Sequence, residues 1–99
     1  MARFGVYKNP DGDGYLLDVQ ANLLSHLNTR VVVPLLPLEI APTPARTLNP
    51  IFDLEGTPFS MATQFMAAVP VQVLKTAVQS LENQRNEVTA ALDLLFQGF

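Results

Sequence analysis

The chain has 99 residues and a net charge of −3, and 48% of its residues are hydrophobic while only 15% are charged. This length supports one domain over residues 1–99 with a single modest core, and the apolar surplus predicts an oligomer that covers part of it. The basic residues are scattered, which argues against avid binding of nucleic acid by this chain alone. The absence of cysteine excludes disulfides, thiolate metal sites and a cysteine nucleophile.

The chain carries no segment that predicts export or membrane insertion. Its first residues lack the long apolar core of a signal peptide. The longest apolar run, Val31–Leu38, is interrupted by Pro34 and Pro37 and is too short to cross a bilayer. Together with the absence of cysteine, these features favour a cytoplasmic protein without membrane contact.

The first third of the chain has the pattern of β-strands. Phe4–Tyr7 predicts a strand, the turn-rich segment Asn9–Gly14 predicts a hairpin connection, and Tyr15–Gln20 predicts the partner strand. Thr29–Val33 is β-branched and apolar on both faces, which indicates a central strand. We expect that strand to stop at Pro34, because proline cannot donate to a β-ladder.

The middle of the chain predicts irregular structure followed by a second hairpin. Leu35–Pro44 contains three prolines and is expected to form an extended arm rather than helix or central strand. Ile51–Leu54 and Thr57–Met61 predict a smaller hairpin. Residues 62–69 are ambiguous, and residues 70–74 favour a short strand or turn. Lys75–Leu81 is expected to begin helical structure.

The last twenty residues, Ser80–Phe99, have the clearest pattern, which is that of an amphipathic helix. Ser80 can accept a backbone N–H at the start, and Gly98 can end the helix in a left-handed conformation. Strands followed by one long helix favour an antiparallel sheet, curled towards a small barrel, with the helix packed on it. The apolar residues at helical spacing are Leu81, Val88, Leu92, Leu95 and Phe99. Phe99, at the chain end, is expected to pack either on its own domain or on another chain.

No residue pattern predicts catalysis or a metal site. His26 is the single histidine and has no neighbouring group that would orient it as a base. Asp11–Gly14 lacks the later ligands of a calcium loop, so a hairpin turn is the better interpretation. The acidic residues of the helix do not share one tight face. We therefore expect a protein that is not an enzyme and that uses no metal or cofactor.

Five blocks of sequence, in this order and with matching spacing, resemble the CcdB-type toxins of bacterial toxin–antitoxin modules. The resemblance covers nearly the whole chain. It implies a mainly β fold with one C-terminal helix, an SH3-like barrel of the CcdB and MazF toxin type with an antiparallel sheet and a small side sheet. The blocks are Phe4-x-Val6-Tyr7, Leu17–Gln20 with Leu23-Leu24, Val31–Leu35, Met66–Val71 and Ala91–Phe99.

The resemblance also implies partners and an activity. It implies a homodimer that poisons DNA gyrase, a type II topoisomerase, by binding the gyrase A subunit. A CcdA-type antitoxin would neutralise the toxin, and the toxin–antitoxin complex would bind operator DNA and repress its own operon. Two alternatives remain: an endoribonuclease of the related MazF type, and a non-toxic remnant with the CcdB fold.

Site residues follow from the resemblance position by position. Where the family ends in Trp-Gly-Ile, this chain has Gln97-Gly98-Phe99, so the tryptophan is absent. Apolar residues in these positions could instead belong to the core, which is their commoner role. The implied gyrase-binding residues are Leu23, Leu24, Ser25, Ala90, Asp93, Phe96, Gln97, Gly98 and Phe99. The implied dimer contacts are Leu95 and Phe99. The implied antitoxin contacts are Lys8, Asn9, Asp11, Asp13 and Tyr15, together with the proline-rich arm.

Overall fold

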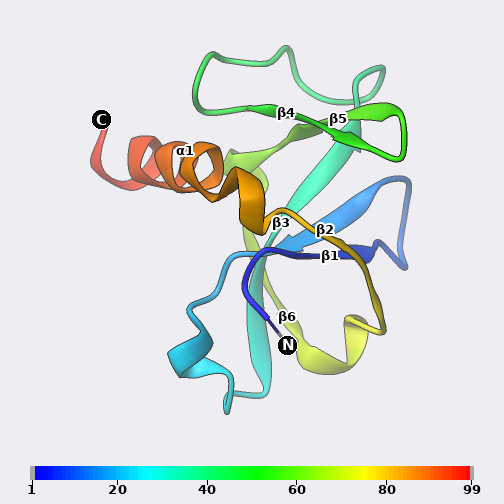
Figure 1. The fold of residues 1–99 in the computed structure, drawn as a ribbon, viewed down its shortest axis with the longest axis vertical. Helices are drawn as coiled ribbons and strands as arrows, with labels where there is room; N and C mark the ends of the chain where they lie inside the picture. Colours follow the sequence, from blue (N-terminus) through cyan, green and yellow to red (C-terminus); the bar gives the residue numbers. More distant parts are fainter. Residues whose placement is uncertain (1, 99) are drawn as a thin grey trace.

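The computed structural model describes residues 2–98, which form one curled β-sheet and a C-terminal α-helix (Figure 1). The strands are β1 (Gly5–Lys8), β2 (Tyr15–Asp18), β3 (Thr29–Pro37), β4 (Ile51–Leu54), β5 (Thr57–Met61), β6 (Ala67–Pro70) and β7 (Ala77–Ser80). The helix α1 spans Arg85–Gln97. Four short 3-10 turns lie in the connections between these elements: η1 (Asn22–Leu24), η2 (Thr63–Phe65), η3 (Val71–Val73) and η4 (Glu82–Gln84).

Strand β3 is the centre of the sheet, as its apolar sequence predicts. The strand order is β4-β5-β3-β2-β1-β7, and β6 also pairs with β3. Val32 pairs with Asp18 of β2 on one side and with Ala67 of β6 on the other. Three residues further along, Leu35 pairs with Tyr15 of β2 and with Met61 of β5. One edge of β3 therefore serves two different strands in succession.

The expectation that this strand stops at Pro34 is wrong, and so is the assignment of residues 35–37 to an irregular arm. Pro34 lies opposite Leu16 of β2, and its carbonyl accepts a hydrogen bond from the amide of Ala62 at 2.9 Å. The N–H and C=O of a strand residue point to the same edge. A backbone N–H at position 34 would therefore point to the junction between β6 and β5, where neither strand pairs with this residue. Its absence in proline breaks no ladder hydrogen bond, and the strand continues to Pro37.

Both predicted hairpins are confirmed. In the first, Val6 pairs with Leu17, and the amide of Asn9 donates to the carbonyl of Gly14 at 3.2 Å. In the second, β4 and β5 pair antiparallel around Glu55 and Gly56, whose φ angles of 54° and 86° are typical of a tight hairpin turn. This second hairpin joins the far end of β3 and continues the same curled sheet.

The helix begins later than the sequence predicts. Residues 77–80 form strand β7 beside β1 instead of helix, because the open edge of β1 takes a second antiparallel partner there. Ser80 does accept a backbone hydrogen bond, from Glu82 at 3.1 Å, but it is the last residue of β7 and lies before the η4 turn, whose N-cap is Leu81. Gly98 ends α1 as predicted, with a φ of 81° and a hydrogen bond to the carbonyl of Leu94.

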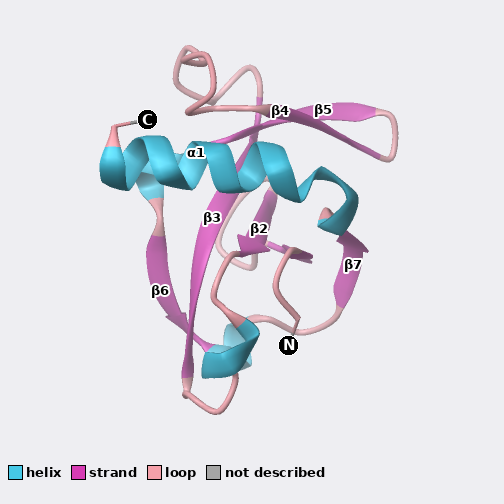
Figure 2. Ribbon diagram, turned by 60° about the vertical axis from the view of Figure 1, so that its left-hand side comes forward, coloured by secondary structure: helices cyan, strands magenta, loops and turns pink. Residues whose placement is uncertain are grey.

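The sheet is buried on both faces where its central strands lie. Helix α1 crosses one face in front of β3 (Figure 2) and buries Val88, Ala91 and Leu92 there. The other face carries a smaller cluster. The first cluster contains Phe4, Val6, Leu17, Val19, Val33, Leu35, Phe52, Leu54, Phe59, Met61 and Leu81, and the second contains Tyr7, Leu16, Val32 and Leu74. The predicted core face of the helix is thus confirmed for Val88 and Leu92, whereas Leu95 remains 36% exposed. Leu81 is buried as predicted, but it lies before the helix.

Candidate protein-binding site

A groove of about 470 Å³ lies between the second half of α1 and the loop that follows β2. Leu24 of the loop lines one side and Phe96 of the helix lines the other, so the fold brings together two residues that are 72 positions apart in the sequence. Both side chains are open to solvent, with exposed fractions of 42% for Leu24 and 69% for Phe96. The remaining lining residues are Arg3, Val19, Gln20, Ala21, Val31, Met66 and Leu92.

The loop that follows β2 exposes its leucines to solvent, and local hydrogen bonds order its backbone. Residues 21–29 are all exposed, and Leu23, at 87%, is the most exposed large hydrophobic side chain described. Within the 3-10 turn η1, Leu24 donates to the carbonyl of Ala21 at 2.9 Å and Ser25 donates to that of Asn22 at 3.0 Å. These bonds satisfy the backbone of the turn locally, and the side chains of Leu23 and Leu24 face water. Such exposure is typical of a contact surface.

A buried polar network supports this loop, and sequence reasoning missed it. Arg30 and Asp18 are fully buried and form a salt bridge of 2.8 Å. Asp18 accepts a hydrogen bond from the backbone N–H of Gln20, and the side chain of Gln20 donates to the carbonyl of Leu24 and accepts from the amide of Val31. The sequence signal was available: two polar residues alternate with apolar ones in a strand next to a central strand that is apolar on both faces.

Burial affects the ionisation of this network. Loss of hydration raises the pKa of Asp18 above its ordinary value, because burial outweighs the opposing effects of the Arg30 hydrogen bond and charge. Burial also raises the pKa of the Tyr7 hydroxyl, and the negative charge of Asp18 adds to that shift while Arg30 reduces it. The Nη1 atom of Arg30 has no hydrogen-bond partner within residues 2–98. The guanidinium therefore depends on Asp18 for charge compensation.

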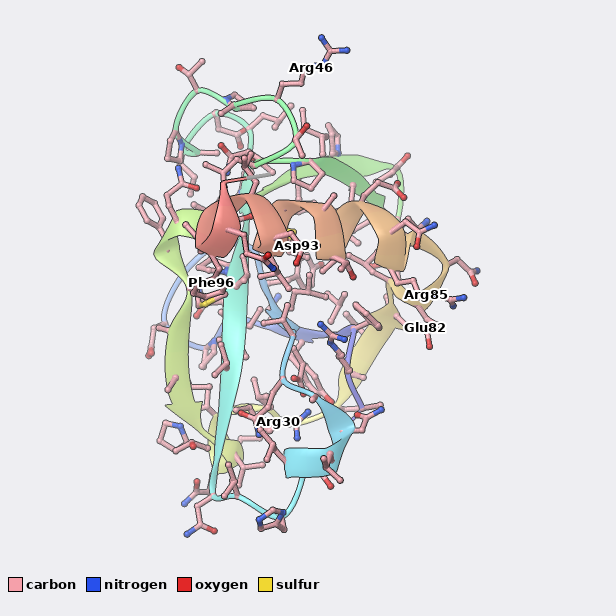
Figure 3. All side chains as sticks on the ribbon, turned by 90° about the vertical axis from the view of Figure 1, so that its left-hand side faces the viewer. Arg30, Arg46, Glu82, Arg85, Asp93 and Phe96 are labelled. Atoms are coloured by element: carbon pink, nitrogen blue, oxygen red, sulfur yellow. The ribbon has the colours of Figure 1, made fainter. Side chains whose placement is uncertain are left out.

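The helix brings the predicted gyrase-binding residues to its outer side. Figure 3 shows Asp93 and Phe96 along α1, with Arg30 well below them beside η1. Asp93 is half-buried, whereas Ala90 and Gln97 are exposed. Only Phe96 of the helical set lines the groove together with Leu24; Leu23, Ser25, Ala90, Asp93, Gln97 and Gly98 are not part of its lining. Phe99, predicted in both the gyrase and the dimer contacts, lies outside the described residues.

The predicted antitoxin residues belong to the β1–β2 hairpin. Asp11 and Asp13 are exposed near its tip. Tyr15 is half-buried, and its ring packs edge-on against Phe59 with the centroids 5.2 Å apart. Lys8 and Asn9 line a second hollow of about 360 Å³ together with Pro10, Val73, Lys75 and Thr76. The five predicted residues therefore do not share one surface: two are exposed at the tip, one packs against Phe59 and two line this hollow.

The described residues contain neither a group of side chains suited to bind a metal ion nor a helix suited to cross a membrane. Within residues 2–98, no three His, Cys, Asp or Glu side chains come together in a way that could hold a metal ion. In the same part of the chain, α1 is the longest helix, and neither it nor any other helix has the length and apolarity that a bilayer crossing requires.

Residues 3–98 match the family described as CcdB protein. The chain belongs to the CcdB family. This membership makes it a toxin of the toxin–antitoxin type, in line with the resemblance of its sequence blocks. The fold is also similar to that of a solved structure described as an endoribonuclease in complex with its cognate antitoxin from mycobacterial species. That similarity has a TM-score of 0.74 at 16% sequence identity and covers 94% of this chain and 91% of the other, so it shows a shared toxin fold alone.

Proposed function

We propose that this CcdB-family protein inhibits DNA gyrase by binding the gyrase A subunit through the groove between Leu24 and Phe96. The protein acts without catalysis of its own: it holds gyrase on cleaved DNA. A cognate CcdA-type antitoxin neutralises it, and the pair represses their operon by binding operator DNA together. The toxin acts as a homodimer in the cytoplasm, with Leu95 and Phe99 at the dimer contact.

The observation that carries this proposal is the convergence of Leu24 and Phe96 on one apolar groove. Both residues were assigned to gyrase binding from sequence blocks at opposite ends of the chain. Exposed aromatic and aliphatic side chains around a hollow are the features that anchor a protein partner. Phe96 is 69% exposed, in a helix whose buried face is formed by Val88, Ala91 and Leu92, so most of its ring is available to a partner.

The groove fits protein binding better than RNA cleavage. Its lining contains no histidine and no carboxylate, and Arg3 is its single charged residue. An endoribonuclease needs acid–base groups at the scissile phosphate and a cationic channel for the strand. The endoribonuclease alternative, which the distant structural relative raises, therefore has no support from the residues of this groove.

The test is a plasmid assay with purified protein and the host's own gyrase. Supercoiled plasmid, gyrase and toxin are incubated with ATP, then treated with detergent and protease. Linear plasmid is the expected product, and bulk RNA incubated in parallel should remain intact. Leu24→Asp should abolish linearisation, whereas Val78→Asp, at a similarly exposed position on β7, should leave it unchanged. RNA fragments without plasmid linearisation would overturn the proposal in favour of the endoribonuclease.

A further inference from the structure

Arg3 is the one charged side chain in the groove, and the fold holds it in place by several independent contacts. Its Nε donates to the carbonyl of Val19 at 3.1 Å, and its guanidinium lies over the ring of Phe4, 4.8 Å from the centroid. Its backbone N–H donates to the side-chain oxygen of Asn22 at 2.8 Å. An arginine fixed in this way loses little side-chain entropy when a ligand binds.

The backbone next to Arg3 is also unusual. Phe4 has a φ of 73°, a left-handed conformation that a bulky residue rarely adopts. The turn is closed by a hydrogen bond from the amide of Gly5 to the carbonyl of Ala2 at 3.1 Å, and the amide of Phe4 donates to the backbone carbonyl of Asp18 at 2.7 Å. Residues held in such a conformation often occur at binding sites, where the surrounding structure compensates the strain. Here the turn orients Arg3 towards the groove.

Within residues 2–98, no salt bridge pairs Arg3 with an acidic side chain. Within residues 2–98 the acidic side chains that form salt bridges are Asp18, paired with Arg30, and Glu82, paired with Arg85. The groove around Arg3 is otherwise apolar, with Leu24, Met66 and Leu92 among its walls. A cation beside apolar walls complements a carboxylate next to a large apolar side chain, and a guanidinium can bind a carboxylate with two parallel hydrogen bonds.

We propose that Arg3 is a specificity-determining residue of the groove, which recognises an aspartate or glutamate of a peptide segment that also inserts a neighbouring apolar side chain. This inference rests on the proposed use of the groove for protein binding, but it concerns the chemistry of the bound segment and not the identity of the partner. Nucleic acid is the weaker candidate, because the apolar walls provide no further cations for a phosphate backbone.

The test selects ligands without assuming a partner. Random twelve-residue peptides displayed on phage are selected on the immobilised full-length protein. Recovered peptides should be enriched in an acidic residue next to Leu, Ile, Met or Phe. For the best peptide, replacing that acidic residue by its amide should weaken binding about tenfold, which is the order expected for one charge-assisted hydrogen-bonded pair.

Variants of the protein test whether Arg3 causes the preference for the acidic peptide. Arg3→Gln should bind the acidic and the amide peptide with equal affinity. The amide peptide should also bind Arg3→Gln as tightly as it binds wild type. This second result would show that the variant is folded. Arg46→Gln removes an exposed arginine elsewhere and should keep the tenfold preference. Selected peptides without acidic residues, a preference that survives Arg3→Gln, or a single-stranded oligonucleotide that outcompetes the peptides would each overturn the inference. A negative gyrase assay would leave it standing, because gyrase takes no part in this test.

Discussion

The side-chain amide of Gln20 donates a hydrogen bond to the carbonyl oxygen of Leu24 at 3.0 Å, and this contact ties the exposed loop to the buried core. The same side chain accepts a hydrogen bond from the backbone of Val31 in the central strand. Gln20 is only 7% exposed, although it is adjacent to a loop that is exposed throughout. The position of Leu24 at the groove is therefore set by a residue that makes few contacts with solvent.

Gln20→Glu is expected to loosen the loop. The substitution keeps the shape of the side chain but replaces the amide donor with a carboxylate oxygen, which repels the carbonyl of Leu24. We expect a loss of about 1–3 kcal/mol in the free energy of unfolding. The amides of Leu24, Ser25 and Leu27 should exchange with solvent much faster, as measured by hydrogen exchange. Gln72→Glu, at an exposed position of η3, is the matched control and should change neither quantity. Unchanged exchange at Leu24 in Gln20→Glu would contradict the anchoring role.

The buried ion pair should be far more sensitive than the exposed one. Asp18→Asn leaves the buried guanidinium of Arg30 without a counter-charge and is expected to destabilise the fold by about 3–5 kcal/mol. Glu82→Gln breaks the 3.7 Å pair with Arg85, whose side chain is 63% exposed, and should cost at most about 1 kcal/mol. Urea denaturation of both variants measures the difference. Similar losses for the two variants would show that the buried pair has no special role.

Stability at high pH should depend on Tyr7. Burial, assisted by the charge of Asp18, raises the pKa of its hydroxyl, so the folded state keeps this proton to a higher pH than the unfolded chain does. The stability that this group contributes is fully present below the unfolded tyrosine pKa of about 10 and is lost as pH rises through the higher folded pKa. Urea titrations between about pH 8 and pH 11 should show a smaller decline for Tyr7→Phe than for wild type. An equal decline for Tyr7→Phe and wild type would contradict this role of Tyr7.

Gln97→Trp should increase toxicity. Gln97 stands where the resemblance places the tryptophan of the family, and it is exposed at the end of α1. A tryptophan offers a flat aromatic face, worth about 0.5–2 kcal/mol per stacking or cation–π contact, which glutamine cannot provide. We expect weak killing of hosts with typical gyrases by wild type and stronger killing by Gln97→Trp, measured as colony counts after induction. Deleting residues 97–99 should abolish any toxicity. Strong killing by wild type, unchanged in Gln97→Trp, would assign the contact to another residue.

Leu95→Asp should convert the proposed dimer to a monomer without unfolding it. Leu95 is 36% exposed in the single chain, so a charge there is tolerated by the monomer but is buried unpaired in a dimer that uses this face. Light scattering at micromolar concentration should show the loss of the dimer, and circular dichroism should show an unchanged fold. Thr89→Asp, exposed on another side of the same helix, should remain dimeric. A wild-type protein that is already monomeric would remove this prediction.

The sequence alone determined the two hairpins, the core of the central strand and the apolar face of the helix. Period-two alternation identified both hairpins, and the spacing of Val88 and Leu92 identified the core face of α1, because these patterns depend only on local backbone geometry. Gly98 was assigned as the helix end for the same local reason. The resemblance of the sequence blocks identified the CcdB family and selected Leu24 and Phe96.

The tertiary structure decided what depends on neighbours that are distant in sequence. Pro34 lies within a strand because two successive partners share one edge of β3, and residues 77–80 become a strand because β1 has an open edge there. The burial of Asp18 with Arg30 and the fixed position of Arg3 at the groove follow from contacts that no periodicity reveals. Local patterns report the conformation of a segment, whereas the environment of a polar side chain is set by whichever segments pack around it.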